Sequence, residues 1–179
     1  RPSIDALFRS AAFYHGERVI GVVLSGMLND GTAGLWTIKD KGGVTVVQNP
    51  EDSLCSSMPE SAMKNVDVDY IVNASDISSL LIKLTNEKIP VSKKKYASDI
   101  NKIEIDLAKE ELMDDGDMDI IGKASEFTCP ECNGSLWKML EGKLLRYRCR
   151  TGHAYNAEAM LSHIDEKIES HLWSSIRGV

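Results

Sequence analysis

The stretch Val19–Trp36, VIGVVLSGMLNDGTAGLW, decides the fold of this chain. It opens with a short, β-branched and almost wholly apolar run, which is typical of a strand buried on both faces of a parallel sheet. A glycine-rich turn follows, and then a helix is predicted from about Thr32 to Lys41, where Gly42-Gly43 ends it. A buried strand that passes through a short turn into a helix indicates an α/β domain with a parallel sheet.

The same alternation continues on both sides of this stretch. The elements expected there are strands at Val44–Gln48 and Tyr70–Val72, and helices at Ser3–His15, Pro59–Asn65 and from a cap at Ser75 or Asp76 to Leu84. Short connections between these elements predict right-handed crossovers in a doubly wound, mostly parallel sheet. Three strands are few for such a sheet, so we expect further strands before Arg1 and expect the chain to be a fragment.

Composition narrows the class of protein. The 179 residues carry a net charge of −6, which disfavours binding to nucleic acid through a broad basic surface. The longest apolar run, Val19–Leu24, is far too short to cross a bilayer, and no signal peptide is visible. These features predict a cytoplasmic protein without membrane insertion.

Character changes along the chain and predicts four segments. Residues 1–88 form the α/β part, and residues 89–125 form a charged, polar linker that contains the run Lys93–Lys95. Residues 126–156 contain the clustered cysteines, and residues 157–179 have a helical pattern. We therefore expect the end of an α/β domain, a linker, a small β-hairpin module and a C-terminal helix.

The glycine-rich turn Gly26–Gly34 lies at the carboxyl end of a predicted strand, where open α/β sheets bind their ligands. Within it, Asp30 lies beside the positive end of the next helix, which favours a carboxylate. Such a carboxylate can orient a histidine of a Ser-His-Asp triad, or it can simply cap the helix that follows. The turn has neither the G-x-G-x-x-G pattern of dinucleotide sites nor a Walker lysine.

Cysteine spacing indicates a metal site. Cys129, Cys132, Cys149 and His153 follow the pattern C-x2-C-x16-C-x3-H, and a hairpin of Ser135–Leu140 with Leu144–Cys149 brings the two ligand pairs together. Three thiolates and one imidazole make a closed tetrahedral shell, which is the structural type of zinc site. The alternatives are an iron site and three reduced cysteines beside an unrelated histidine; the lone Cys55 is expected to be a free thiol.

The C-terminal helix is expected to be capped by Asn156 and to carry an apolar stripe. The stripe consists of Leu161, Ile164, Ile168, Leu172 and Ile176, at three- and four-residue steps. It can pack on the hairpin module or pair with another helix. His163 and His171 flank the stripe and are not predicted to bind a second metal.

Several motifs together resemble a known family. They are R-P-S-I-D-A-L-F-R-S-A-A from Arg1, V-V-L-S-G-M-L-N-D-G-T-A-G-L from Val22, G-G-V-T-V-V-Q-N-P from Gly42 and M-P-E-S-A from Met58. In order and spacing, residues 1–85 resemble the C-terminal half of the catalytic domain of CheB-type chemotaxis protein-glutamate methylesterases. The pattern from Cys129 to Tyr155 also resembles a zinc-ribbon tail found on a subset of that family.

The resemblance implies a function. It implies a carboxylic ester hydrolase that removes methyl groups from glutamates on the cytoplasmic helices of methylated chemoreceptors, and that can deamidate glutamines there. It places the triad aspartate at Asp30. Because Gly26, Met27 and Gly31 lie in the same turn, we expect them to shape the pocket and its turn, and plain packing is the alternative for Met27. The family's serine and histidine belong to segments that this chain does not contain, so the chain is expected to be inactive alone. The local candidates, Ser25 and His15, lack the surroundings of a nucleophile and a base.

Two departures and one rival complete the expectation. Leu28 replaces a glycine that many members carry, which narrows the conformational freedom of the turn but leaves Asp30 in place. Ser56-Ser57 replaces their Pro-Gly pair, which affects the fine shape of that loop and not the fold. The rival is a non-catalytic module in which the zinc ribbon recruits a protein or a nucleic acid. Its basic residues are Lys138, Lys143, Arg146, Arg148 and Arg150.

Overall fold

The computed structural model describes residues 4–88, 115–141 and 143–178, and the chain divides into two units, Arg1–Ile105 and Asp106–Val179. Each unit is described by itself. Most of the predicted linker, including the run Lys93–Lys95, lies outside the described residues.

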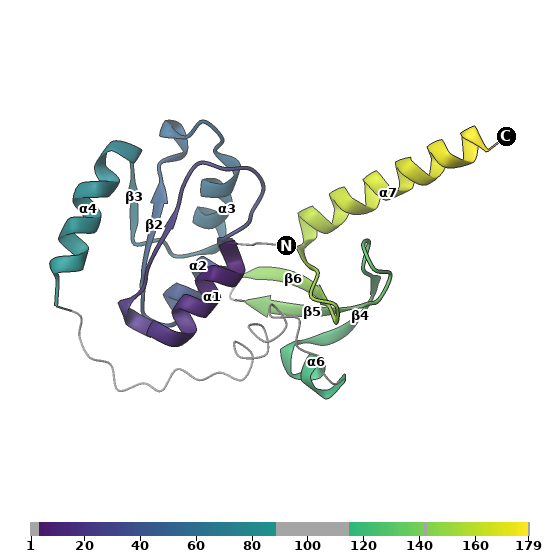
Figure 1. Cartoon of the computed structure of the whole chain (residues 1–179), viewed down its shortest axis with the longest axis horizontal. Helices are drawn as coiled ribbons and strands as arrows, with labels where there is room; N and C mark the ends of the chain where they lie inside the picture. Colours follow the sequence, from purple (N-terminus) through teal and green to yellow (C-terminus); the bar gives the residue numbers. More distant parts are fainter. Residues whose placement is uncertain (1–3, 89–114, 142, 179) are drawn as a thin grey trace. The chain divides into compact units, whose positions relative to one another are not determined.

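A three-stranded parallel sheet forms the centre of the first unit, in the order β1-β2-β3 (Figure 1). The strands are β1 (Ile20–Val23), β2 (Val44–Gln48) and β3 (Tyr70–Val72). Apolar side chains from β1, β2 and two helices form its core, namely Val23, Leu35, Val47, Met58, Ala62 and Val66. The parallel pairing of β1 with β2 and of β2 with β3 confirms the predicted parallel α/β sheet.

Four helices accompany this sheet close to where the sequence places them. They are α1 (Ile4–His15), α2 (Thr32–Asp40), α3 (Ser57–Asn65) and α4 (Ala74–Asn86), and short 3₁₀ turns occupy Gly16–Arg18 and Pro50–Asp52. Glycine permits the closest contact between two of them, because a Cβ on Gly34 of α2 would lie 2.6 Å from the Cβ of Phe8 on α1.

The predicted cap of α4 at Ser75 or Asp76 is wrong. The helix begins at Ala74, and Asn73 occupies the cap position without a capping side-chain bond. A carboxylate from another loop takes over, since Asp52 Oδ2 accepts the N–H of Ala74 at 2.7 Å. A cap supplied by tertiary contact leaves no signal in the local sequence.

The second unit contains a four-stranded antiparallel sheet in the order β4-β5-β6-β7 (Figure 1). Its strands are β4 (Lys123–Thr128), β5 (Ser135–Glu141), β6 (Leu144–Cys149) and β7 (Ala154–Asn156). The predicted hairpin corresponds to β5 and β6. The outer strands β4 and β7 were not expected, because each is short or mostly exposed and so lacks a clear apolar pattern.

The end of the predicted linker is ordered, which corrects part of that prediction. Residues 115–125 form helix α6 (Asp115–Ile121) and the start of β4. Met118 is fully buried, and Trp137 of β5 donates its indole N–H to Asp119 at 3.2 Å. Gly122 lets the chain pass so close to β5 that an added Cβ would lie 2.3 Å from the carbonyl oxygen of Lys138.

Helix α7 (Ala157–Arg177) ends the second unit, and its predicted cap is confirmed, since Asn156 Oδ1 accepts the N–H of Ala159 at 2.7 Å. Of the apolar stripe, Ile164 packs against the core beside Met160, whereas most of the stripe is exposed. The exposed members are Leu161, Ile168, Leu172 and Ile176. Among the described helices, none combines the length and the apolar character that a membrane span needs.

The carboxylate of Asp69, next to β3, connects this strand to β2 through hydrogen bonds. Replacing this carboxylate tests the arrangement. Its Oδ2 accepts from the N–H and the hydroxyl of Thr45 at 2.9 and 2.8 Å, and its Oδ1 accepts from the ammonium of Lys39. We expect Asp69→Asn to lower the free energy of unfolding of this unit by about 1–2 kcal/mol at neutral pH. Urea unfolding followed at NMR cross-peaks of β2 measures it.

The pH dependence of this loss is fixed by the pKa of Asp69. Burial acts to raise that pKa, but the Lys39 ammonium and the Thr45 hydrogen bonds hold it below the ordinary value of 3.8. A carboxyl group whose pKa is lower in the folded state than in the unfolded state stabilises the fold fully at pH values above its unfolded-state pKa. This stabilisation disappears as the pH falls through the folded-state pKa. The gap between wild type and variant should therefore close in acid; a gap that persists below this range would contradict the assignment.

Candidate functional site

Two loops at the carboxyl ends of β1 and β2 are joined by backbone hydrogen bonds. The N–H of Gly26 donates to the carbonyl of Cys55 at 3.0 Å, and the N–H of Met58 donates to the carbonyl of Gly26 at 3.1 Å. Ser57 adds a side-chain bridge, because its hydroxyl accepts from the N–H of Leu28 at 3.0 Å. Hydrogen bonds from the loop after β2 therefore stabilise the glycine-rich turn, in addition to the bonds within the turn itself.

Asp30 caps a helix, but not the one that the sequence suggested. Its Oδ2 accepts the N–H of Ile4 at 3.0 Å and its Oδ1 accepts the N–H of Asp5 at 3.2 Å, both at the start of α1. The following helix α2 has Gly31 at its cap position and no capping side chain. The prediction that Asp30 would cap the following helix, offered as the alternative to a triad role, is therefore wrong.

A reciprocal contact joins the same two helices. Asp5, in the first turn of α1, accepts the N–H of Gly34 in the first turn of α2 at 2.7 Å. Each helix thus receives a carboxylate at its positive end from the other segment. The two backbone bonds hold the Asp30 carboxylate in one orientation at the start of α1.

The other predicted residues of this turn differ in their exposure. Met27 projects outward with 72% of its surface exposed, so its thioether is available to a ligand. Gly31 is buried with φ at +89°, and an added Cβ would lie 2.8 Å from Cγ2 of Ile4. Gly26 lies under Met58, whose methyl carbon an added Cβ would meet at 2.6 Å. The two glycines serve the backbone, and Met27 has a free side chain.

In the second unit the four predicted ligands gather into one cluster. Cys129, Cys132, Cys149 and His153 place their ligand atoms within 4.8 Å of one another, and all three of these cysteines carry free thiols. The measured separations are 3.6 Å between the sulfurs of Cys132 and Cys149, and 3.5 and 3.4 Å from His153 Nδ1 to the sulfurs of Cys129 and Cys149.

These separations fit a tetrahedral metal ion. Around zinc, sulfur–sulfur and sulfur–nitrogen edges of about 3.8 and about 3.6 Å follow from the usual zinc–ligand distances. Two sulfurs in a disulfide would instead lie at about 2.05 Å. The cluster therefore has the chemistry and the spacing to hold one tetrahedral ion, with no ligand position left open.

Two tight turns shape the cluster. In the first, the N–H of Cys129 donates to the carbonyl of Gly134 at 2.8 Å, and Asn133 has a left-handed backbone with φ at +58°. In the second, the N–H of Cys149 donates to the carbonyl of His153 at 3.0 Å, and Gly152 has φ at +98°. Each turn thus presents one pair of ligands, and the hairpin of β5 and β6 connects the pairs.

Thiol acidity differs across the cluster. Burial acts to raise the pKa of Cys132, but the Thr151 hydroxyl and the Gly134 N–H lead the hydrogen bonds that lower this pKa to about 6. Burial raises the pKa of Cys149 to about 11. Cys132 is also the exposed thiol of the three, so it is the one most readily reached by an incoming cation.

Two residues beside the cluster escaped the sequence reasoning. Glu131 Oε2 lies 3.2 Å from Nε2 of His153, and its Oε1 accepts the hydroxyl of Tyr155 at 2.6 Å. Burial, together with Glu131, raises the pKa of Tyr155, so the phenol keeps its proton. In the sequence Glu131 reads as a turn residue between two cysteines; its position inside the ligand spacer was the available signal.

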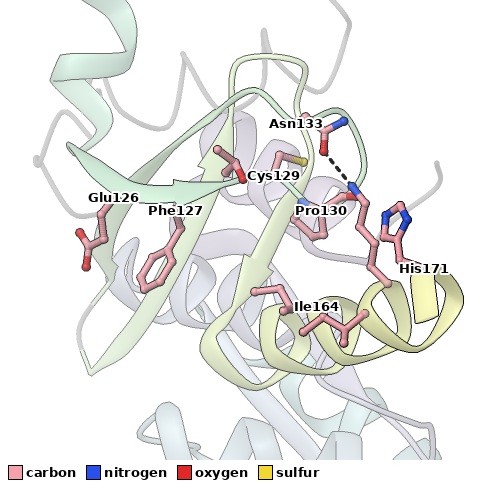
Figure 2. Close-up of a pocket in the computed structure, with 10 residues that line it drawn as sticks. Glu126, Phe127, Cys129, Pro130, Asn133, Ile164 and His171 are labelled. Atoms are coloured by element: carbon pink, nitrogen blue, oxygen red, sulfur yellow. Dashed lines mark hydrogen bonds between the residues drawn. The ribbon is translucent and has the colours of Figure 1, made fainter. Parts of the chain in front are cut away.

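A groove of about 340 Å³ separates the turn that contains Cys129 and Asn133 from α7 (Figure 2). Pro130 and Phe127 line it opposite Ile164 of α7, and His171 lies at the same helix (Figure 2). Lys167 crosses it, donating to the carbonyl of Pro130 at 2.8 Å and to Asn133 Oδ1 at 2.7 Å. The cysteine turn and the terminal helix are thereby connected.

Comparison with known proteins finds a family match within the first unit. The model of the CheB methylesterase family matches residues 1–81, which we call the CheB-type segment for this similarity. The cysteine–histidine cluster lies outside this match.

Relatives of the CheB-type segment come from distant organisms. A protein of Leptospira interrogans, provisionally named a protein-glutamate methylesterase/protein-glutamine glutaminase, is 40% identical over 89 residues. The match covers 50% of this chain and 46% of that protein. A protein-glutamate methylesterase/protein-glutamine glutaminase of Pyrococcus horikoshii is 39% identical over 83 residues, covering 46% of this chain and 23% of that protein. The crystal structure of the Thermotoga maritima CheB methylesterase catalytic domain has 33% identity and a TM-score of 0.46, covering 47% of this chain and 44% of that one. The chain spans less than half the length of each.

In the CheB-type segment, Leu28 has a left-handed backbone with φ at +66°. Glycine adopts this conformation without strain, which gives a physical reason for the glycine that the resemblance places there. Ser57, the second of the departures, compensates by bridging Leu28 and Gly26 through its hydroxyl. The turn therefore keeps its backbone conformation although Leu28, unlike glycine, is disfavoured at a positive φ.

Neither local candidate for a nucleophile or a base is placed for catalysis. The hydroxyl of Ser25 accepts from the N–H of Cys55 at 2.9 Å and donates to its carbonyl at 3.3 Å, which ties it to the neighbouring loop. His15 ends α1 while Asp30 binds its first turn, and a 12-residue helix separates them by about 16 Å. The contacts of Ser25 favour a structural role, and the length of α1 keeps His15 away from Asp30.

Replacing the carboxylate of Asp30 tests its structural contact. Asp30→Asn leaves one acceptor oxygen for two N–H groups, so we expect the start of α1 to lose about 1 kcal/mol of protection. Amide hydrogen exchange at Ile4 and Asp5 should quicken while exchange in β2 stays close to wild type. Unchanged exchange at both amides would show that the two hydrogen bonds contribute nothing.

Proposed function

We propose that this chain is part of a protein-glutamate methylesterase in which Asp30 is the triad carboxylate. The observation that carries the proposal is the placement of Asp30, which lies beyond the carboxyl end of β1 and is fixed there by two backbone N–H groups. The family match over residues 1–81 and the names of the relatives support the same reaction. The proposed substrates are methylated glutamates, and in addition glutamines, on the cytoplasmic helices of chemoreceptors.

The proposed chemistry is acyl transfer through a serine. The serine oxygen attacks the ester carbonyl, a histidine takes the serine proton, and methanol leaves before water hydrolyses the acyl-enzyme. Asp30 holds the histidine in the tautomer that can accept this proton and stabilises the imidazolium that forms. The proposed nucleophile and histidine lie in a part of the protein outside this chain, so catalysis requires that part.

We also propose that Cys129, Cys132, Cys149 and His153 hold one structural zinc ion. The tetrahedral edges that their ligand atoms form support this assignment. The module around them has a small core, built on Leu136, Tyr147 and Met160 with the two buried cysteines. Zinc contributes about 10–16 kcal/mol of binding free energy in comparable peptides, enough to determine whether such a module folds.

The segments that we propose follow from these two sites. Residues 1–88 form the end of the catalytic domain, residues 126–156 the core of the zinc ribbon, and residues 157–179 the terminal helix. In this proposal the connection between the two units is shorter than residues 89–125, because α6 and β4 belong with the ribbon.

A binding role for the ribbon is the second candidate function. Its nucleic-acid form is disfavoured, since Arg146 and Arg148 are only 5% and 7% exposed and Arg146 bonds Glu141 at 3.1 Å. Two of the five basic residues are therefore not available to phosphates. The exposed apolar stripe of α7 favours recruitment of a protein instead.

Activity of the intact protein tests the role of Asp30. We expect Asp30→Asn in the full-length enzyme to reduce kcat for methyl-ester hydrolysis by about 10⁴-fold, as the histidine loses its tautomer control. Methanol release from a methylated receptor preparation measures this rate.

A stability-matched control separates catalysis from folding. Asp5→Asn weakens the same pair of helices through the Gly34 contact while leaving the carboxylate of Asp30 in place. It should retain activity close to wild type at a temperature where both variants are folded. Equal losses in the two variants would reduce Asp30 to a structural residue.

Metal content of the chain tests the zinc proposal. We expect about one zinc per chain by atomic emission, and loss of both the metal and the β4–β7 sheet in Cys129→Ser, because a three-ligand shell binds far more weakly. Cys55→Ser is the matched control, since Cys55 belongs to the first unit, and it should keep its zinc. A folded, metal-free wild-type ribbon would refute the assignment.

A further inference from the structure

The imidazole of His153 has one defined orientation in the cluster. Its Nδ1 lies 3.5 and 3.4 Å from the sulfurs of Cys129 and Cys149, while its Nε2 lies 3.2 Å from Glu131 Oε2. One ring nitrogen therefore faces the sulfurs and the other faces a carboxylate.

We propose that Glu131 is a positioning residue: it accepts the Nε2–H of His153 and thereby fixes Nδ1 as the metal-binding nitrogen. This inference rests on the zinc site proposed above and adds a residue outside its ligand set. A metal-binding nitrogen must be free of its proton, and a neutral imidazole carries one N–H. A carboxylate can only accept, so the proton belongs on Nε2 and the lone pair on Nδ1.

Glu131 is itself held in place. The hydroxyl of Tyr155 donates to Oε1 at 2.6 Å, so the two carboxylate oxygens have different partners. Tyr155 is buried, and its ring meets that of His163 on α7 edge-on, with centroids 5.4 Å apart. A rigid phenol thus sets the position of the carboxylate, which in turn sets the plane of the imidazole.

The location of Glu131 in the chain gives this contact a second effect. It lies in the two-residue spacer between Cys129 and Cys132, whereas His153 belongs to the other ligand pair. Its carboxylate therefore bridges the two turns directly. Loss of the bridge weakens the geometry of the site without removing any ligand.

Zinc affinity of the full chain tests this role. Removal of residues that orient metal ligands costs about 10–100-fold in metal affinity, and because Glu131 is partly exposed we expect Glu131→Gln to lie near the lower end, at about 10-fold. Competition with a chromophoric zinc chelator measures the dissociation constant. Glu166→Gln is the control, because Glu166 lies 3.9 Å from His163 on α7 and is not part of the cluster; its affinity should match wild type.

A second background distinguishes positioning from a general effect on folding. His153→Cys keeps four ligands but removes the imidazole, so Glu131→Gln should change zinc affinity by less than about twofold in that background. An equal loss in both backgrounds would overturn the proposal, because Glu131 would then act independently of His153. Wild-type affinity in Glu131→Gln alone would overturn it as well, while leaving the zinc site itself intact.

The ring nitrogens give an independent readout. In ¹⁵N-labelled, zinc-loaded chain, long-range ¹H–¹⁵N spectra should show the proton of His153 on Nε2 and the metal on Nδ1. Metal on Nε2 would overturn the proposal. A wild-type chain that binds no zinc would refute the site and this inference together, and so would be distinguishable from failure of the positioning role alone.

Discussion

The hydrogen bonds of the Asp30 carboxylate are the contact that holds the helix starts of the first unit together. It binds the first turn of α1 through the N–H groups of Ile4 and Asp5, while Asp5 binds the first turn of α2 in return. Two helix starts therefore hold each other through two acidic side chains. The arrangement fixes the Asp30 carboxylate beyond the carboxyl end of β1, which is where open parallel sheets bind their ligands.

The triad role that we propose for Asp30 depends on the same contact. Capping immobilises the side chain, and an immobile carboxylate is what a triad histidine requires. The structural contact at this position therefore supports the proposed catalytic role.

The second unit relies on a different constraint. Its cysteine–histidine cluster, the proposed ligand shell, joins two turns that are distant in sequence, and its core is too small to make the apolar contribution dominant. Glu131, Tyr155 and Lys167 surround this shell and connect it to the sheet and to α7. The groove in Figure 2 lies between the cysteine turn and α7, where Lys167 links them.

The sequence by itself determined the parallel strands, the order of the helices in the first unit and the four clustered ligands, because apolar periodicity and ligand spacing are local patterns. Only the tertiary structure decided which helix Asp30 caps, that Asp52 caps α4, that residues 115–125 join the ribbon, and that Glu131 faces His153. Each of these depends on a hydrogen bond or a packing contact between residues distant along the chain. Such a contact depends on the path of the backbone in space, so a local pattern at one partner does not identify the other partner.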